Sequence, residues 1–358
     1  MKNKVILIIL LIIGFFSCKI SNVFEGEHKF IENFPLMLFP EAETLIVDMP
    51  GIVDLAIVDT ILLALIMTDP EILLQAYSLN NYKQKCILLK KGQGPDEFLQ
   101  ASIPKQFTED STGYKAWMID YSLRILFLLN ITKTIERQHT VVEKKYNLKG
   151  LGFTFDWVYA NDSLFWGTNW TLDNLELFAY NPKKEKITNQ TKLFTPIHNT
   201  SFYYISAYSH GVSVKPDLSK IVLNMLYLNQ LHIISLNNIE ERFSFSTSKN
   251  TGNFEQIIKI TNEDVGDLVA FYRDVRTTNQ FIFASYNEYK RRDEDDAKKT
   301  VIHVFDWDGN PIAWIELPHR TPYFAIDEKR GFLYGLVEDS MIEKEIIYKY
   351  DIKDLFGK

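Results

Sequence analysis

The sequence predicts an all-β fold and, within that class, a six-bladed β-propeller. Short apolar runs recur between Asn, Asp, Gly, Pro or Lys residues, which is typical of many antiparallel strands. Six segments then share one layout: a strand, a turn, a second apolar strand and an outer strand that ends polar. Their spacing of roughly 35–55 residues is near what a four-stranded propeller blade requires.

Each predicted blade corresponds to one repeated unit. The six units are Ile52–Leu89, Lys115–Leu148, Phe153–Ile187, Gly211–Phe245, Leu268–Leu317 and Tyr323–Asp351. In four units a polar turn precedes the second strand, as at Asp217–Lys220, and Asp, Asn or Ser there can bond its own backbone. Residues 28–47 contain a further strand, which we expect to complete the last blade and close the ring. Residues 28–358 are therefore interpreted as one propeller domain.

Two other arrangements remain open at this stage. A seven-bladed ring is an alternative if residues 189–210 or 249–266 contain a degenerate blade. The stretch Phe254–Leu268 could equally form a short helix on an inter-blade loop. A β-sandwich is disfavoured because it does not need so many equivalent units.

The first 17 residues have the layout of a secretory signal peptide. Lys2 and Lys4 precede an apolar run, and Ser17 leads to Cys18. The apolar run from Val5 to Phe16 is too short for a membrane span, which needs about 20 residues. A small residue directly before a cysteine resembles the lipobox of bacterial lipoproteins.

The lipobox resemblance implies cleavage before Cys18 and a lipid on its thiol. Residues 18–27 would then be a lipidated spacer, and the domain would be anchored in the cell envelope, on the outer membrane. An ordinary signal peptide with an incidental cysteine is the alternative, because Phe15 departs from the leucine preferred there. No acidic pair follows Cys18, which favours a periplasm-facing domain.

Composition restricts the class of partner and the redox chemistry. The chain of 358 residues has 46% hydrophobic and 14% aromatic residues, which is typical of a globular protein rich in strands. A net charge of −7 without a basic cluster argues against nucleic-acid binding. Cys18 and Cys86 are the two cysteines, so lipidation of the first leaves no internal disulfide. We expect Cys86 to be a buried strand residue.

A glycine-rich segment follows the first unit, from Gly92 to Phe98. It resembles the G-x-G-P-x-E-F signature of TolB-like six-bladed propeller lipoproteins of Bacteroidetes. Two later segments, Val304–Asn310 and Phe324–Asp327, resemble other parts of the same family, and Asp96 is a small departure from its pattern. The resemblance implies a fold and a location and no settled activity.

The residues of this segment also make physical sense individually. We expect Gly92 and Gly94 to adopt backbone angles that are closed to other residues, and Pro95 to fix the turn. Glu97 could accept backbone N–H bonds in the loop, and Phe98 could fill an apolar gap beside the first blade. The functional alternative places Glu97 in the central pocket. A dinucleotide fingerprint is excluded because no helix pattern follows.

No catalytic or metal-binding motif is present, so we predict no cofactor, no metal and no catalytic residue. The seven histidines are scattered at positions 28, 139, 198, 210, 232, 303 and 319. Four carboxylates near strand starts could reach a channel mouth, as paired acids do in some glycoside hydrolases, although turn capping explains them better. These are Asp120, Asp156, Asp274 and Asp327.

Two further groups of residues have competing interpretations. The charged run Lys290–Asp296 is most simply a solvated hairpin tip, with calcium binding by Asp293, Asp295 and Asp296 as the alternative. An aromatic platform for a sugar or peptide competes with core packing at three tryptophans. These are Trp157, Trp166 and Trp170.

The sequence therefore supports two classes of function. The first hypothesis is a lipid-anchored envelope propeller that acts as a non-enzymatic binding or scaffolding module for a protein or glycan partner. The alternative is an envelope hydrolase or lactonase with acids from several blades in the central channel. Carboxylates around a metal-sized gap would favour the enzyme, and an apolar plug would exclude it.

Overall fold

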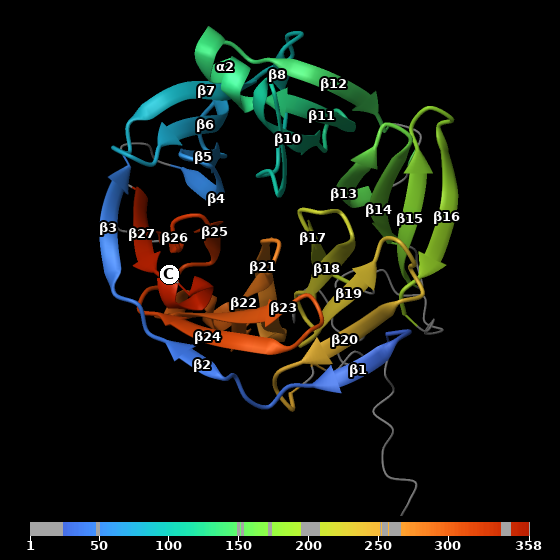
Figure 1. The fold of residues 1–358 in the computed structure, drawn as a ribbon, viewed down its shortest axis with the longest axis vertical. Helices are drawn as coiled ribbons and strands as arrows, with labels where there is room; N and C mark the ends of the chain where they lie inside the picture. Colours follow the sequence, from blue (N-terminus) through green and yellow to red (C-terminus); the bar gives the residue numbers. More distant parts are fainter. Residues whose placement is uncertain are drawn as a thin grey trace, which may run out of the picture.

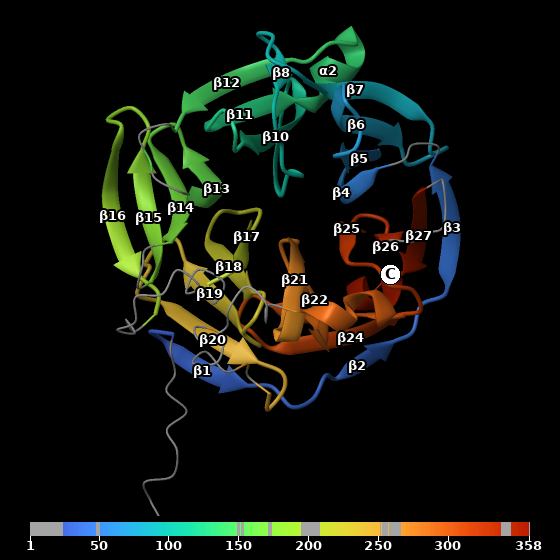
Figure 2. The same ribbon diagram turned by 180° about the vertical axis from the view of Figure 1, so that it is seen from behind.

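Six sheets, each with four antiparallel strands, surround a central channel in the computed structural model (Figure 1), and the view from behind shows the same ring (Figure 2). Three of the sheets carry a fifth strand that pairs in parallel. The structure describes residues 24–47, 51–148, 151, 154–170, 174–194, 208–250, 252, 257, 266–337 and 345–357. The prediction of a six-bladed propeller is confirmed, and the seven-bladed alternative is wrong.

The first three blades follow one another along the chain. Blade 1 consists of β4 (Ile52–Val58), β5 (Ile61–Ile66), β6 (Ile72–Ser78), β7 (Gln84–Lys91) and β8 (Glu97–Phe98). Blade 2 consists of β9 (Gln106–Asp110), β10 (Gly113–Asp120), β11 (Ile125–Asn130), helix α2 (Ile131–Arg137) and β12 (Val142–Asn147). Blade 3 consists of β13 (Thr154–Asn161), β14 (Leu164–Trp170), β15 (Leu175–Asn181) and β16 (Lys186–Lys192).

The last three blades complete the ring. Blade 4 contains β17 (His210–Val214), β18 (Lys220–Met225), β19 (Leu231–Ser235) and β20 (Arg242–Ser246). Blade 5 contains β21 (Val269–Thr277), β22 (Phe281–Lys290), η2 (Arg291–Asp296), β23 (Thr300–Asp306) and β24 (Pro311–Leu317). Blade 6 contains β25 (Tyr323–Asp327), β26 (Phe332–Val337) and β27 (Glu345–Asp351), followed by η3 (Lys353–Phe356).

Residues 24–47, which we call the N-terminal strap, run along the outer rim of three blades (blue in Figure 1). β1 (Glu27–Phe30) pairs in parallel with β20, and β2 (Leu36–Leu38) pairs in parallel with β24. β3 (Ala42–Val47) pairs antiparallel with β27 and completes blade 6. The expected closing strand is confirmed, and the two outer strands before it are additional.

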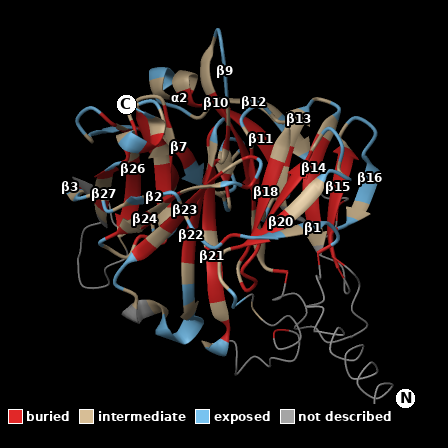
Figure 3. Ribbon diagram, turned by 60° about the horizontal axis from the view of Figure 1, so that its bottom comes forward, coloured by how far each residue is buried: buried red, intermediate tan, exposed pale blue. Residues whose placement is uncertain are grey.

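The strands in the middle of each blade are apolar on both faces because neighbouring blades cover both faces. All six residues of β5 and all six of β11 are buried. At the rim, β12 alternates between partly buried and exposed residues. Figure 3 shows this gradient, with buried strands inside and exposed segments at the periphery.

Blade 2 differs from its predicted unit in two places, before its first residue and in its interior. Its innermost strand, β9, lies before Lys115 and was not included, because its sequence QFTED carries a single apolar side chain. Helix α2 was not predicted either. Its N-cap is the buried Asn130, whose side chain accepts a hydrogen bond of 2.8 Å from the Lys133 backbone N–H.

Within the described residues, no helix is long and apolar enough to cross a membrane. Residues 1–23, including Cys18, lie outside the described part of the chain, as do residues 254–256 and 258–265 of the stretch Phe254–Leu268.

Candidate functional site

Three cavities lie in series along the central channel in the part of the chain that the structure describes. The strand-start cavity, of about 330 Å³, lies at the N-terminal ends of the inner strands β17, β21 and β25. The middle cavity, of about 270 Å³, shares Arg273 and Tyr323 with it. The strand-end cavity, of about 130 Å³, shares Lys105, Gln106 and Val214 with the middle cavity. These shared residues lie where neighbouring cavities adjoin.

All six blades contribute to the wall of the middle cavity. Three carboxylates come from the inner strands of alternate blades, namely Asp54, Asp156 and Asp274. Lys105 enters from the segment just before β9, and Tyr323 enters from β25. The cavity is therefore polar at its centre, although the sheets around it are apolar.

A network of ion pairs crosses the channel next to this cavity. The buried Arg276 side chain pairs with Asp54, and its Nη2 lies 3.0 Å from Asp274 Oδ2. Arg276 Nε also donates a hydrogen bond of 2.8 Å to the Phe324 carbonyl. The Lys105 Nζ lies 3.3 Å from Asp274 Oδ1. Two carboxylates are thus balanced by two cations.

Burial is the main influence on the Asp54 carboxyl. It raises the pKa of Asp54 to about 6, although Arg276 opposes the rise, and the neighbouring Asp274 adds to it. Asp156 is held differently. It accepts a hydrogen bond of 2.9 Å from the Val212 N–H and another from Tyr121. Among the described residues no cation forms an ion pair with Asp156.

The sequence analysis set two conditions: carboxylates around a metal-sized gap would favour an enzyme, and an apolar plug would exclude one. The channel meets neither condition. Three carboxylates do converge on it, but Arg276 and Lys105 lie among them. In the part of the chain that the structure describes, no group of three or more His, Cys, Asp or Glu side chains could hold a metal ion. An apolar plug is not what closes the channel, because its centre is charged.

The strand-start cavity combines aromatic, amide and charged side chains. Arg273 pairs with Glu294 of η2, and its guanidinium carbon lies 5.6 Å from the Tyr323 ring centroid. Arg291, also on η2, donates a hydrogen bond of 3.2 Å to the Tyr227 hydroxyl. Asn224 is 2% exposed, and its Oδ1 has no hydrogen-bond partner among the described residues. The remaining lining residues include Ser209, His210, Asn287 and Tyr289.

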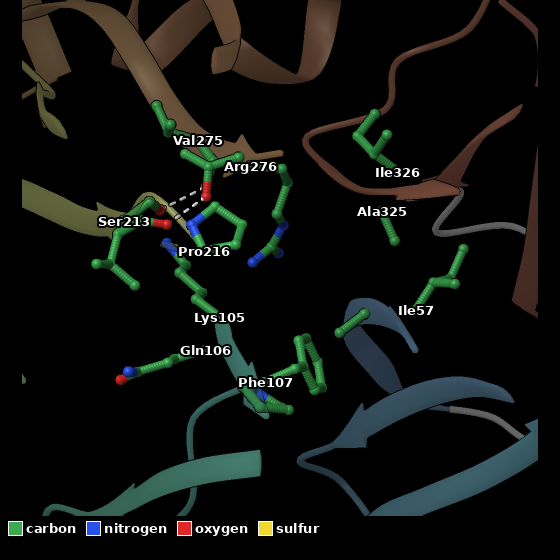
Figure 4. Close-up of a pocket in the computed structure, with 14 residues that line it drawn as sticks. Ile57, Lys105, Gln106, Phe107, Ser213, Pro216, Val275, Arg276, Ala325 and Ile326 are labelled. Carbon is green, nitrogen blue, oxygen red and sulfur yellow. Dashed lines mark hydrogen bonds between the residues drawn. The ribbon is translucent and has the colours of Figure 1, made fainter. Parts of the chain in front are cut away.

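The strand-end cavity is smaller and mostly apolar. Figure 4 shows Arg276 pointing toward its centre, with Ser213 and Pro216 on one side and Ile57 and Ala325 on the other. The Ser213 hydroxyl donates a hydrogen bond of 2.8 Å to the Val275 carbonyl, so it is already committed to the fold. This end of the channel offers few free polar groups to a ligand.

The four carboxylates singled out in the sequence divide into two pairs. Asp120 accepts backbone hydrogen bonds from Leu99, Gln100 and Leu123, and Asp327 accepts one from Arg330. Both therefore stabilise turns and loops, as the structural interpretation has it. Asp156 and Asp274 line the middle cavity instead.

Sequence reasoning missed the other residues that make the channel. Asp54, Lys105, Arg276 and Asn224 carry no local motif, because each comes from a different part of the chain. One signal was present: the three channel aspartates each precede an apolar residue on an innermost strand. The pairs are Asp54-Leu55, Asp156-Trp157 and Asp274-Val275. Superposing the repeated units would have brought them together.

The segment from Gly92 to Phe98 folds back onto the outer strand of blade 1, where β8 pairs in parallel with β7. The Glu97 carboxylate accepts a hydrogen bond of 2.8 Å from the Gly94 N–H. Phe98 is 1% exposed and stacks on Phe127 of blade 2, with ring centroids 4.3 Å apart. Glu97 does not line any of the three channel cavities.

The expected reason for the two glycines is wrong. Neither Gly92 nor Gly94 has a positive φ. Close approach explains them instead, because a Cβ on Gly92 would lie 2.0 Å from Glu97 Oε2 and one on Gly94 would lie 3.0 Å from the Glu97 Cδ. These glycines leave room for the carboxylate that closes the loop.

The other candidate residues are dispersed. Asp293, on η2, is exposed, and the side chains of Asp295 and Asp296 lie outside the description. Trp166 belongs to the hydrophobic core, Trp157 lines the middle cavity, and the Trp170 side chain is not described. Cys86 is buried on β7, and burial raises the pKa of its thiol.

Of the six histidines that the structure describes, one lines the channel. His210 lies in the strand-start cavity, and burial lowers the pKa of its imidazole. His232 and His303 are buried in the outer half of blades 4 and 5. His198 lies outside the described residues.

Comparison with known proteins gives the family. A model of the TolB-like 6-blade propeller-like family matches residues 43–329. A search of curated proteins found no match. Two crystal structures share the fold. The first is of a Bacteroides fragilis NCTC 9343 protein that is predicted to be exported; it is 12% identical with a TM-score of 0.51, and the match covers 90% of this chain and 99% of that one. The second is of a member of the duf4221 family from Bacteroides vulgatus ATCC 8482; it is 11% identical with a TM-score of 0.56, and the match covers 88% of this chain and 96% of that one. The chain belongs to the TolB-like six-bladed propeller family.

Proposed function

We propose that this chain is a cell-envelope propeller that binds a protein or glycan partner at its channel without transforming it. The observation that carries the proposal is the state of the three channel carboxylates. Asp54 and Asp274 are paired with Arg276, and Asp156 accepts hydrogen bonds from Val212 and Tyr121. A nucleophile or general base has to be free to meet a substrate, whereas a binding wall does not.

The strand-start cavity is the binding site in this proposal. Its volume of about 330 Å³ exceeds those of the middle and strand-end cavities, and it combines tyrosine rings with amide, guanidinium and carboxylate groups. Ligand sites commonly combine an apolar wall with a few polar groups that fix orientation. The strand-end cavity is smaller, and its walls are mostly apolar.

The test combines binding with chemical analysis of the ligand. Soluble fragments of envelope polysaccharide and peptidoglycan are equilibrated with the protein, and free and bound fragments are weighed by mass spectrometry. Fragments that bind and keep their mass support the proposal, and fragments whose mass changes contradict it. Ser209→Trp fills the strand-start cavity and should weaken binding at least about tenfold through steric exclusion. Ser122→Trp, on an exposed turn, is the matched control.

One observation favours the second candidate, an envelope hydrolase or lactonase. The pKa of Asp54 is raised to about 6 by burial, and the nearby Asp274 adds to the rise. A carboxyl in this range can serve as a general acid near neutral pH. Turnover that Asp54→Asn abolishes, with binding retained, would establish this candidate and overturn the first.

The anchoring proposal rests on the sequence of residues 1–27. Cleavage before Cys18 and lipidation of its thiol would place the domain on the outer membrane, facing the periplasm. Cys18→Ala should abolish palmitate labelling and release the protein from membranes. Cys86→Ala, at a buried strand position, should keep both the palmitate label and the membrane association. Membrane fractionation that is unchanged in Cys18→Ala would contradict the anchor, and protease digestion of intact cells tests the orientation.

We also propose that the family signature in this chain is structural. Gly92, Gly94, Pro95, Glu97 and Phe98 would lock the first blade to the second rather than bind a ligand. The carboxylate–backbone bond within the loop and the buried aromatic stack between the blades support this role.

A further inference from the structure

We propose that the strand-start cavity binds an acidic sugar, a hexuronate unit of a glycan. This inference rests on the proposed binding function and narrows it to one class of ligand. Three features of the cavity carry it: its charge, an unsatisfied buried acceptor, and its aromatic wall.

The charged groups on the cavity wall leave an excess of positive charge. Arg273 and Arg291 face one carboxylate, that of Glu294. Glu294 also pairs with Arg320, at 3.0 Å, so two guanidinium groups share it. His210 adds no charge, because burial lowers the pKa of its imidazole. A net positive cavity in a chain of net charge −7 favours an anionic ligand.

Arg291 is the cation that is open to a ligand. It hydrogen-bonds the Tyr227 hydroxyl, and no carboxylate pairs with it among the side chains that the structure describes. The next residue, Arg292, is paired with Asp267 and does not line the cavity. A guanidinium group with free N–H donors matches a carboxylate in shape and charge.

Asn224 supplies the second feature. Its Nδ2 donates a hydrogen bond of 2.9 Å to the Tyr272 carbonyl, which fixes the amide orientation. Its Oδ1 is buried and has no donor among the described residues. The same oxygen lies 2.8 Å from where a Cβ of Gly211 would be, so a larger residue at position 211 would press against it. A sugar hydroxyl is a donor of the right kind for this acceptor.

The aromatic wall is the third feature. Tyr227, Tyr289 and Tyr323 line the cavity, and Arg273 lies over the Tyr323 ring. Tyrosine rings present an apolar face to the C–H side of a sugar and a hydroxyl to its edge. An acidic peptide would pair with the Arg291 guanidinium, but it has no sugar ring whose C–H face could pack on the tyrosines. The combination therefore favours a hexuronate over an acidic side chain.

Calorimetry with three probes tests the inference: digalacturonate, the neutral disaccharide galactobiose and a glutamate-rich peptide. The wild-type protein should bind digalacturonate at least about tenfold more tightly than either other probe. Arg291→Gln should weaken digalacturonate binding about tenfold and leave galactobiose unchanged. Arg292→Gln removes the same charge from the neighbouring position and should change affinity less than about twofold.

Several results would overturn the inference. These are equal affinity for the acidic and neutral sugars, tighter binding of the peptide, equal losses in Arg291→Gln and Arg292→Gln, or no binding of any probe. The proposed binding function would survive each of them if envelope fragments still bind and Ser209→Trp still blocks them. Failure of that second experiment as well would remove both.

Discussion

The central channel and the outer half of the ring are built from the same sheets, yet they bury polar groups in opposite ways. In the channel, Asp54 and Asp274 keep a charged partner, the Arg276 guanidinium. In the outer half, His232 and His303 are buried among aromatic rings, and burial lowers the pKa of each imidazole to about 3. Charge is therefore kept next to the channel cavities, whereas the two imidazoles of the aromatic outer core stay neutral at pH 7.

The N-terminal strap covers both of these histidines. The Phe24 ring lies 4.1 Å from the His232 ring, and the Phe34 ring lies 4.7 Å from the His303 ring. The Tyr286 ring also stacks on His303, with ring centroids 4.3 Å apart. The strap therefore closes the outer core at the places where a buried proton would be most costly.

The largest expected effect comes from removing the cation of the channel network. Arg276→Met leaves Asp54 and Asp274 buried without their guanidinium partner, and we expect the free energy of unfolding at pH 7 to fall by about 3–5 kcal/mol. The loss should shrink below pH 6, because Asp54 has a raised pKa of about 6 and becomes neutral. Chemical denaturation of the wild-type protein and the variant, at pH 7 and at a pH below 6, measures the loss of stability.

The control for this variant is an exposed ion pair. Lys299 pairs with Glu316 at the rim, and its side chain is 61% exposed. Lys299→Met should change the free energy of unfolding by less than about 1 kcal/mol. If the two variants are equally stable, the channel network does not hold the fold together.

The second effect tests the histidines of the outer half. Their pKa of about 3 in the folded state lies below the usual value of 6.5, so the unfolded chain binds protons first as the pH falls. Between pH 7 and pH 5 we expect each histidine to lower the free energy of unfolding by about 2 kcal/mol. Denaturation curves across this range measure the slope.

His303→Phe should flatten that pH dependence, because it removes one of the histidines whose pKa is lowered by burial. His139→Phe is the matched control, since His139 is exposed. A slope that His303→Phe leaves as steep as in the wild-type protein would show that this histidine is not a neutral core residue.

The smallest effect concerns Glu97, whose carboxylate accepts a backbone hydrogen bond and forms no ion pair among the described residues. Gly92→Ala places a methyl group against the Glu97 carboxylate and should displace it from the Gly94 N–H, at a cost of about 1–2 kcal/mol. In a Glu97→Ala background the same substitution should cost less than about 0.5 kcal/mol. Equal costs in both backgrounds would point to backbone conformation and not to close approach.

Much of the fold was predictable from the sequence because the inner strands of every blade are covered on both faces. β5 is apolar throughout, and β11 is apolar except for its last residue, Asn130. The turns between strands carry polar residues whose side chains accept hydrogen bonds from nearby backbone, as Asp217 does from the Ser219 N–H. The sequence did not predict three of the strands, namely β9, β1 and β2. Each is short or polar, and its position depends on pairing with a strand that is distant in the sequence or on its place in the ring.

The site was less predictable for a physical reason. Asp54 and Arg276 are 222 residues apart in sequence and meet because the ring brings blades 1 and 5 to one axis. Local patterns report turns and strand faces, so they found Asp120 and Asp327 as readily as Asp156 and Asp274. Only the closed ring distinguishes a turn cap from a channel residue.

The strap has one more consequence. Its first described residue, Phe24, bridges Phe194 beyond the outer edge of blade 3 and sits on the rim, away from the axis. A lipid on Cys18 would reach this point through six residues, which span at most about 20 Å. Such an anchor would join the domain near the outermost strands of blades 3 and 4, and not at the channel axis.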